Sequence, residues 1–293
     1  MNPPVWTIRK LLQWSSPWLA ERGVDSPRLD AELLLADTLE LERIGLFLDP
    51  DRPLTRDELD GFKNRLKRRA LREPVAYIIG RKDFWKDSFV VDPHVLIPRP
   101  ETETLLECVL NHYTDRNVAW RFLEIGCGSG ALLISLMREF PFATGMGLDI
   151  SREAIAISAL NARKTKTASR IDWLESDLLH ALKQPWQCHA MVANLPYIAQ
   201  GDIPSLQPEV ALYEPRLALD GGVDGLQIIR QLIPSAAQFL APGGLLALEI
   251  DSRQRQEVVR LLESNGFGSV SSLDDCHHVP RVVFGIFADG RQD

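Results

Sequence analysis

From Arg121 onward, short apolar runs alternate with stretches of helical spacing, and this alternation restricts the possible folds more than any other feature of the chain. Seven runs have the length of strands: 121–125, 144–149, 171–174, 189–193, 244–250, 267–271 and 281–287. Strands that alternate with helices form a mainly parallel sheet covered on both faces. We therefore predict an α/β fold built on a seven-stranded, mostly parallel sheet.

Residues 1–80 follow a different pattern, in which helix-start signals precede apolar side chains at helical spacing. Pro17 is expected to break or bend the first of these helices. Favoured cap residues and a first-turn proline stand at three places: Thr7, Ser26-Pro27 and Thr55. This range is therefore predicted to form a small helical domain.

Between Tyr77 and Pro98 the apolar runs shorten and turn residues separate them, which predicts a connecting β-hairpin. Residues 63–72, just before it, are strongly basic, as expected either for a solvated helix face or for a surface that docks an acidic partner. The chain is thus predicted to have three parts: a helical, substrate-recognising domain over 1–80, a hairpin linker over 81–98 and the α/β domain over 99–293.

The charge balance argues against a nucleic-acid binder, because 33 lysines and arginines face 40 acidic residues, for a net charge of −7. Affinity for duplex nucleic acid comes largely from neutralising phosphates, so no stable nucleic-acid partner is expected. The apolar stretches fall well short of the ~20 residues needed to span a bilayer. The N-terminus lacks the pattern of a signal peptide, so we expect a cytoplasmic protein without a membrane partner.

The cysteines show no paired spacing, and a chain of 293 residues can build a core without disulfides. Cys276, His277 and His278 stand side by side, and three adjacent residues cannot easily converge on one ion. No second cluster of ligand-type residues accompanies them. Reduced thiols and no metal site are therefore expected.

A glycine turn follows directly on the first predicted strand of the α/β domain, where residues 126–130 read Gly-Cys-Gly-Ser-Gly before a helix. Glycines at the carboxyl end of a strand let a ligand approach the backbone closely. Asp149 closes the next strand, where its carboxylate can accept hydrogen bonds from both hydroxyls of a ribose. Sites for dinucleotides and sites for S-adenosylmethionine both hold the adenosine part of the ligand in this way. The turn in this chain lacks the third glycine at the dinucleotide spacing, and it therefore resembles the turn of S-adenosylmethionine sites.

On that interpretation Glu124, two residues before the turn, lies near the positively charged methionine end of the ligand. Asp177 is expected on the adenine side with Leu178 packed on the ring, although an aspartate there serves equally well as a helix cap. The predicted cofactor contacts are Glu124, Gly126, Cys127, Gly128, Ser129, Gly130, Asp149, Asp177, Leu178 and Asn194.

The tetrapeptide Asn194-Leu195-Pro196-Tyr197 follows the fourth strand and resembles the Asn-Pro-Pro-Tyr signature of amino-group methyltransferases. The Asn194 side-chain oxygen and the Leu195 carbonyl can each accept one N–H of a planar amide, which aims the nitrogen at a sulfonium methyl. Tyr197 is placed to stack on the planar group, and Pro196 keeps Leu195 extended. Taken alone, the same residues also make an ordinary asparagine–proline turn.

Further stretches look very much like the HemK/PrmC family and cover nearly the whole chain. Before the glycine turn they are Arg28–Leu35, Glu73–Gly80, Asp83–Trp85 and Val95–Glu103, and after the tetrapeptide they are Glu209–Leu226 and Arg281–Val283. The sequence departs from the family where Asp251 follows Ile250 in place of a glycine, in the unusual loop 274–279, and at Leu195 in place of proline.

The resemblance implies a Rossmann-like class I methyltransferase whose substrate is the glutamine of a Gly-Gly-Gln loop in class I peptide-chain release factors. It implies S-adenosylmethionine as cofactor and S-adenosylhomocysteine as product. It also places residues 99–103 near the cofactor, although Arg99 and Glu101 fit an ion-paired helix start as well. We expect the protein to be a monomer.

Three alternatives remain at this point. A nucleic-acid adenine methyltransferase fits the tetrapeptide, since ribosomal RNA adenine dimethyltransferases resemble it in using Asn-Leu-Pro-Tyr, but it needs base flipping and a basic cleft. A glutamine methyltransferase acting on a ribosomal protein is the closer alternative, since it falls within the same family. An inactive S-adenosylmethionine-binding module conflicts with the intact Asn194 and Pro196.

Overall fold

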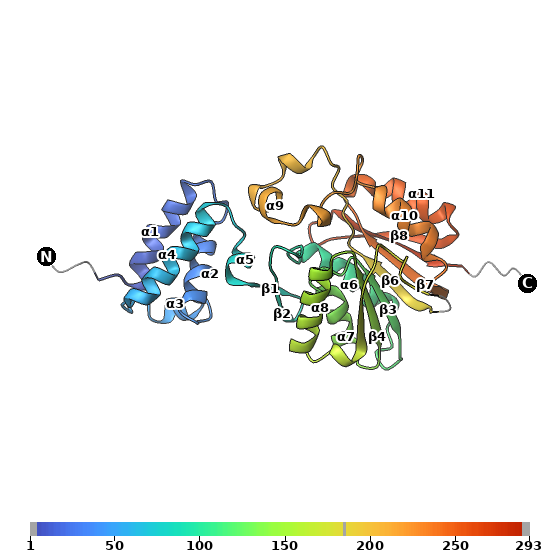
Figure 1. The fold of residues 1–293 in the computed structure, drawn as a ribbon, viewed down its shortest axis with the longest axis horizontal. Helices are drawn as coiled ribbons and strands as arrows, with labels where there is room; N and C mark the ends of the chain where they lie inside the picture. The colour runs from blue at the N-terminus through green and yellow to red at the C-terminus, as the bar shows by residue number, and fades with distance from the viewer. Residues whose placement is uncertain (1–4, 184–185, 289–293) are drawn as a thin grey trace, which may run out of the picture. The chain divides into compact units, whose positions relative to one another are not determined.

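The computed structural model describes residues 5–183 and 186–288, and these divide into two compact units (Figure 1). The helical unit contains the chain up to Gly80 and the separate segment Gln207–Tyr213. The α/β unit contains Arg81–Leu206 and the chain from Glu214 onward. The sequence did not indicate that a short segment after the tetrapeptide would pack with the N-terminal helices.

The helical unit is built around α1, α2 and α4, which pack on one another (Figure 1). Its apolar core includes Leu19, Leu34, Leu46 and Phe62, all buried. Its helices are α1 (Ile8–Ala20), α2 (Pro27–Thr38), α3 (Gly45–Leu48), α4 (Arg56–Ala70), α5 (Val75–Ile79) and α9 (Pro208–Tyr213).

The helix starts match the sequence, with two corrections. The Thr7 hydroxyl caps α1, and Thr55 forms a capping box with Glu58 at the start of α4. Ser26 makes no side-chain cap bond, although Pro27 does begin α2. Of the break or bend expected at Pro17, the break does not occur: α1 continues to Ala20, because its buried face holds the helix on both sides of the proline.

The predicted hairpin is shorter than the apolar pattern indicated. Residues 75–79 form α5, which ends at Gly80 with a φ of 75°, because a short apolar run fits a helix as well as a strand. The hairpin itself consists of β1 (Arg81–Phe84) and β2 (Asp87–Val90). It belongs to the α/β unit and does not stand apart as a linker, which corrects the division of the chain at residues 81–98.

The central sheet has seven strands in the order β5-β4-β3-β6-β7-β9-β8, and β9 alone runs antiparallel between β7 and β8. This confirms the predicted α/β fold with a mostly parallel sheet. The strands are β3 (Arg121–Ile125), β4 (Thr144–Asp149), β5 (Ile171–Glu175), β6 (Cys188–Ala193), β7 (Leu240–Glu249), β8 (Phe267–Asp274) and β9 (Pro280–Phe287).

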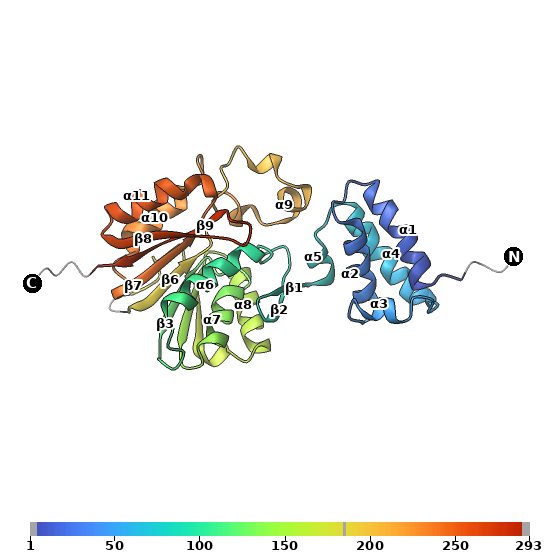
Figure 2. The same cartoon turned by 180° about the vertical axis from the view of Figure 1, so that it is seen from behind.

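Both faces of this sheet are buried, as the continuous apolar runs require (Figures 1 and 2). Along β3, Phe122 packs with α6 and α7, whereas Leu123 packs in the opposite layer with α10 and α11. The larger helices are α6 (Glu103–His112), α7 (Ala131–Glu139), α8 (Arg152–Lys164), α10 (Gln227–Ala236) and α11 (Arg255–Ser264).

The strand order reverses at β3, because β4 and β5 lie on one side of it and β6 lies on the other. In open sheets of this kind, ligands bind beyond the carboxyl ends of the strands where the order reverses. Both the glycine turn after β3 and the tetrapeptide after β6 stand at that place.

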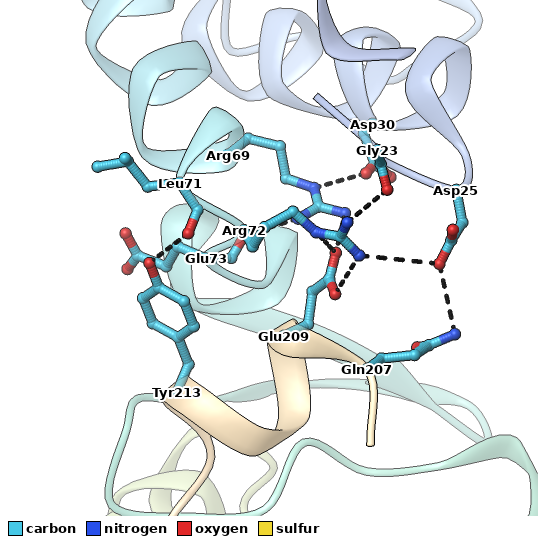
Figure 3. Close-up of polar contacts among 10 residues, drawn as sticks. All are labelled: Gly23, Asp25, Asp30, Arg69, Leu71, Arg72, Glu73, Gln207, Glu209 and Tyr213. Atoms are coloured by element: carbon cyan, nitrogen blue, oxygen red, sulfur yellow. Dashed lines mark hydrogen bonds and ion pairs between the residues drawn. The ribbon is translucent and has the colours of Figure 1, made fainter. Parts of the chain in front are cut away.

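Within the helical unit, α9 is held by a group of buried and half-buried charges that we call the Glu209 ion cluster: Asp30, Arg69, Arg72 and Glu209 (Figure 3). Arg69 donates to Asp30 and to Glu209, both at 2.7 Å, and Arg72 donates to the other Glu209 oxygen at 2.6 Å. The basic run 63–72 is therefore not simply a solvated face, since two of its arginines bind α9.

Candidate active site

The glycine turn is fixed by the backbone of the neighbouring strand. The N–H groups of Gly126 and Cys127 both donate to the Leu148 carbonyl of β4, at 2.8 and 3.0 Å. Gly126, Gly128 and Gly130 have φ values of 71°, 53° and 76°, which L-residues rarely adopt. At Gly130 an added Cβ would also lie 2.9 Å from the Trp173 ring, so the turn requires glycine.

Asp149 joins the end of β4 to this turn. Its Oδ2 accepts the Gly128 N–H at 2.8 Å and its Oδ1 accepts the Ser151 N–H at 2.9 Å. Burial raises the pKa of Asp149, and these backbone N–H groups lower it in part. Each carboxylate oxygen keeps a second lone pair, so the group can still accept two ligand hydroxyls.

Glu124 is more deeply buried, at 4% exposure, and accepts the Leu133 N–H at the start of α7 at 3.1 Å. Burial raises the pKa of Glu124 well above its usual value, and the nearby Asp149 adds to the shift. A carboxyl in this setting is stabilised as an anion when a cation binds beside it.

A cavity of about 330 Å³ opens at the carboxyl ends of β3, β4, β5 and β6, a volume that suits a small-molecule ligand. Most of the predicted site residues line it: Glu124, Gly126, Cys127, Gly128, Ser129, Asp149, Asp177, Leu178, Asn194, Leu195 and Pro196. Within the described ranges, Gly130 and Tyr197 are not among the lining residues. Arg99 and Thr102 are, and Arg99 forms an ion pair with the buried Glu214.

Asn161 on α8 also positions the glycine turn, although no sequence pattern marked it. It is 1% exposed, and its amide nitrogen donates to the Ser129 carbonyl at 2.9 Å and to the Val90 carbonyl at 3.0 Å. Its oxygen accepts the Val90 N–H at 2.8 Å. Asn161 thus links the glycine turn to the hairpin. The one sign of this role in the sequence was an amide side chain on the buried face of a helix.

Asn194 follows β6 directly, and its amide nitrogen donates to the Thr102 hydroxyl at 3.0 Å. In the part of the chain that the structure describes, the Asn194 side-chain oxygen accepts no hydrogen bond, so it is available to a ligand. Leu195 is buried at 4% exposure and packs close to Gly126. Its side chain therefore belongs to the apolar core beneath the turn.

The Tyr197 side chain lies beside Glu249, the last residue of β7, and its backbone carbonyl accepts from Gln254 at 2.9 Å. Burial raises the pKa of Tyr197, and the Glu249 carboxylate adds to the shift. Sequence reasoning had not singled out Glu249, even though a single acid at the end of an apolar strand was a signal.

The loop with adjacent cysteine and histidines is organised by Asp275, which accepts the His277 and Val279 N–H groups and pairs with Arg281. Across residues 5–183 and 186–288, no three metal-ligating side chains gather at one point. In the same ranges no helix is both long and apolar enough to cross a bilayer.

Comparison with known proteins agrees with this geometry. A family model described as the PrmC N-terminal domain matches residues 10–80, and one described as a methyltransferase domain matches residues 122–211. A release factor glutamine methyltransferase of Geobacter sulfurreducens is 40% identical over 284 residues, which cover 97% of this chain and 98% of that one. The chain belongs to the release factor glutamine methyltransferase family. The resemblance seen in the sequence is thereby confirmed.

Another member of the family, from Caulobacter vibrioides, is 40% identical over 268 residues, which cover 92% of each chain. Among solved structures, a 16S rRNA methyltransferase of T. thermophilus in complex with AdoMet and guanosine has a TM-score of 0.53 at 20% identity, covering 70% of this chain and 49% of that one. This likeness concerns the fold alone, and it is that of a class I methyltransferase.

Proposed function

We propose that the enzyme transfers a methyl group from S-adenosylmethionine to the side-chain amide nitrogen of the glutamine in the Gly-Gly-Gln motif of class I peptide-chain release factors. S-adenosylhomocysteine is the second product. The observation that carries the proposal is the full-length match to relatives named release factor glutamine methyltransferase. The free Asn194 oxygen at the cavity supports it, because a planar amide needs such an acceptor.

The residues around the cavity fit the cofactor. All of the proposed contacts line the cavity: the two Asp149 oxygens would accept the ribose hydroxyls, Glu124 would lie beside the positive methionine end, and Asp177 and Leu178 would contact the adenine. The positive φ values of the glycine turn, and the open space beside Gly128, allow a ligand to approach the backbone. When bound, S-adenosylmethionine supplies an electrophilic methyl group on a sulfonium.

The tetrapeptide positions the substrate. The Asn194 side-chain oxygen and the Leu195 carbonyl each accept one N–H of the glutamine amide, and Pro196 keeps that carbonyl turned outward. Both contacts would strengthen as the nitrogen becomes positive, and the one proton that it then loses would pass to solvent. Stacking by Tyr197 stays a prediction, since its side chain lies beside Glu249.

Asp149→Ala is expected to weaken S-adenosylmethionine binding by about ten- to a hundredfold, because a half-buried acceptor of two hydroxyls in the cavity wall is lost. Titration calorimetry of the folded variant measures the change. Glu175→Ala is the matched control, since it removes an exposed carboxylate from the end of the neighbouring β5. Equal affinities of both variants and the unaltered protein would mean that Asp149 does not hold the ribose.

The substrate is tested by incubating the protein with labelled S-adenosylmethionine and, separately, a release factor, ribosomal proteins and nucleic acid. Mass spectrometry of the loop peptide is expected to place the methyl group on the Gly-Gly-Gln glutamine. Label found only in ribosomal proteins, or only in adenine, would instead establish one of the two alternative substrates.

We further propose that the helical unit recognises the protein substrate while the α/β unit binds the cofactor. A truncated protein beginning at Arg81 is expected to keep its affinity for S-adenosylmethionine and to lose methylation of an intact release factor. Calorimetry and single-turnover rates measure the two properties. Full-rate methylation by the truncated protein would contradict this division.

A further inference from the structure

The ion pair between Arg99 and Glu214 is built into the wall of the cavity. Both residues belong to the α/β unit, and Nη2 of Arg99 donates to Oε1 of Glu214. The Glu214 side chain keeps 1% exposure, whereas the Arg99 side chain keeps 31%, and Arg99 lines the cavity. A guanidinium has five N–H donors, and among the described residues this is the one hydrogen bond that the Arg99 side chain makes. A buried acid therefore holds Arg99 on one side, and donors remain for a ligand.

Both members of this pair are joined to the region of the tetrapeptide. The Arg99 carbonyl accepts the Thr102 N–H at 3.1 Å, and the Thr102 hydroxyl accepts from the Asn194 amide nitrogen at 3.0 Å. The segment after the acid is joined to the chain just beyond the tetrapeptide, because the Ile198 N–H donates to the Leu219 carbonyl at 3.1 Å. Arg99 thus lies at the end of the cavity where we place methyl transfer, and not at the adenine end.

The charges on the cavity wall indicate which group Arg99 binds. Four carboxylates line the cavity, those of Glu124, Asp149, Asp177 and Asp220. Among the residues that the structure describes, Arg99 is the one lysine or arginine that lines it. The Gly-Gly-Gln residues of the proposed substrate carry no charge. S-adenosylmethionine carries one anionic group, the carboxylate of its methionine part, so a single cation among acids matches that carboxylate.

We propose that Arg99 binds the methionine carboxylate of S-adenosylmethionine and that Glu214 is a positioning residue for the Arg99 guanidinium. The inference rests on the cofactor proposed above. A guanidinium and a carboxylate are both planar and can form two parallel N–H···O bonds, which a lysine cannot reproduce. With the ammonium group beside Glu124, the two contacts would fix the amino-acid end of the cofactor and so direct the sulfonium methyl toward Asn194.

Titration calorimetry with two ligands tests the contact without any turnover. One ligand is S-adenosylhomocysteine, and the other is its analogue in which hydrogen replaces the carboxylate. Arg99→Gln is expected to weaken binding of S-adenosylhomocysteine by about ten- to a hundredfold and binding of the analogue by less than about threefold, because the analogue has no carboxylate to lose its partner. Arg99→Lys keeps the charge and should recover part of the loss, and it supplies the same comparison if Arg99→Gln does not fold.

Glu214→Gln tests the positioning role, because glutamine keeps the side-chain volume and an acceptor for Arg99 but lacks the charge. Its affinity for S-adenosylhomocysteine should fall severalfold, while its affinity for the analogue should stay unchanged. Arg152→Gln is the matched control, since it removes an exposed arginine from the start of α8, next to Ser151 in the cavity wall. Neither ligand should bind the control more weakly, and thermal melts check that each variant is folded.

Equal losses for the two ligands in Arg99→Gln, or no loss for either, would overturn the inference. So would a carboxylate-dependent loss confined to His94→Gln, since His94 also lines the cavity. Equal losses for both ligands in Glu214→Gln, or no loss, would contradict its positioning role. The proposed substrate is judged separately: a protein that shows the ligand-dependent loss but does not methylate release factors would refute the proposed function and leave the Arg99 contact standing.

Discussion

Asn194→Ala is expected to lower the rate of methyl transfer by ~10²–10³ while S-adenosylmethionine affinity stays within severalfold, the scale seen when one preorganised contact to a reacting group is removed. The Asn194 oxygen is free at the cavity, and the nitrogen is held by Thr102, so the amide is already oriented before the substrate arrives. Single-turnover rates on a release factor and calorimetry with the cofactor measure the two quantities.

Leu195→Pro is the companion variant, because proline keeps the backbone carbonyl that the mechanism uses. Its rate is expected to stay within severalfold, while its melting temperature falls because the Leu195 side chain is buried beneath the glycine turn. A large loss of rate in a folded Leu195→Pro would mean that the side chain reads the substrate. Equal losses of stability and rate in Asn194→Ala would mean that the motif is only a structural turn.

Glu209→Ala is expected to destabilise the helical unit by about 3 kcal/mol, at the lower end of the cost of breaking a buried ion pair. The lower end applies because the Arg72 and Glu209 side chains keep 18% and 13% exposure, whereas Arg69 keeps only 6%. Burial raises the pKa of Glu209, but the bonds from Arg72 and Arg69 outweigh it and hold the acid ionised. Without Glu209 the segment 207–213 should detach, so limited proteolysis should cut there and thermal melting should begin earlier.

Glu21→Ala is the matched control, since it removes a carboxylate with 76% exposure from the same unit. Glu209→Gln distinguishes the effect of losing the charge from the effect of losing the side chain, because glutamine keeps the side-chain volume and one hydrogen-bond acceptor. Protease resistance and melting equal to those of Glu21→Ala would show that the ion cluster does not hold α9.

The sheet was predictable because parallel strands buried on both faces appear as apolar runs, and β3 and β4 were located to the residue. Asp149 and Asn194 were predictable for a related reason, since each follows a strand end at the edge where ligands bind. Both residues line the cavity as expected, and their roles in binding and catalysis stay predictions.

Asn161 was not predictable as a residue of the site, because its partners lie far away in the sequence. Asn161 bonds with Val90 and Ser129, which are distant along the chain, and no local pattern records such pairs. Local signals also failed where tertiary packing overrode them, as at Pro17, where the buried face of α1 carries the helix onward.

Because the helical unit is built from two separate segments of the chain, it cannot be transferred to another protein as one continuous segment. A chimera that moves only residues 1–80 onto another methyltransferase would leave Arg69 and Arg72 without Glu209. The same arrangement affects synthesis on the ribosome, where chains emerge from the N-terminus. The helices can form early, but their ion cluster can be completed only after residue 213 has left the exit tunnel. By then four of the seven strands of the sheet, β3 to β6, have already been synthesised.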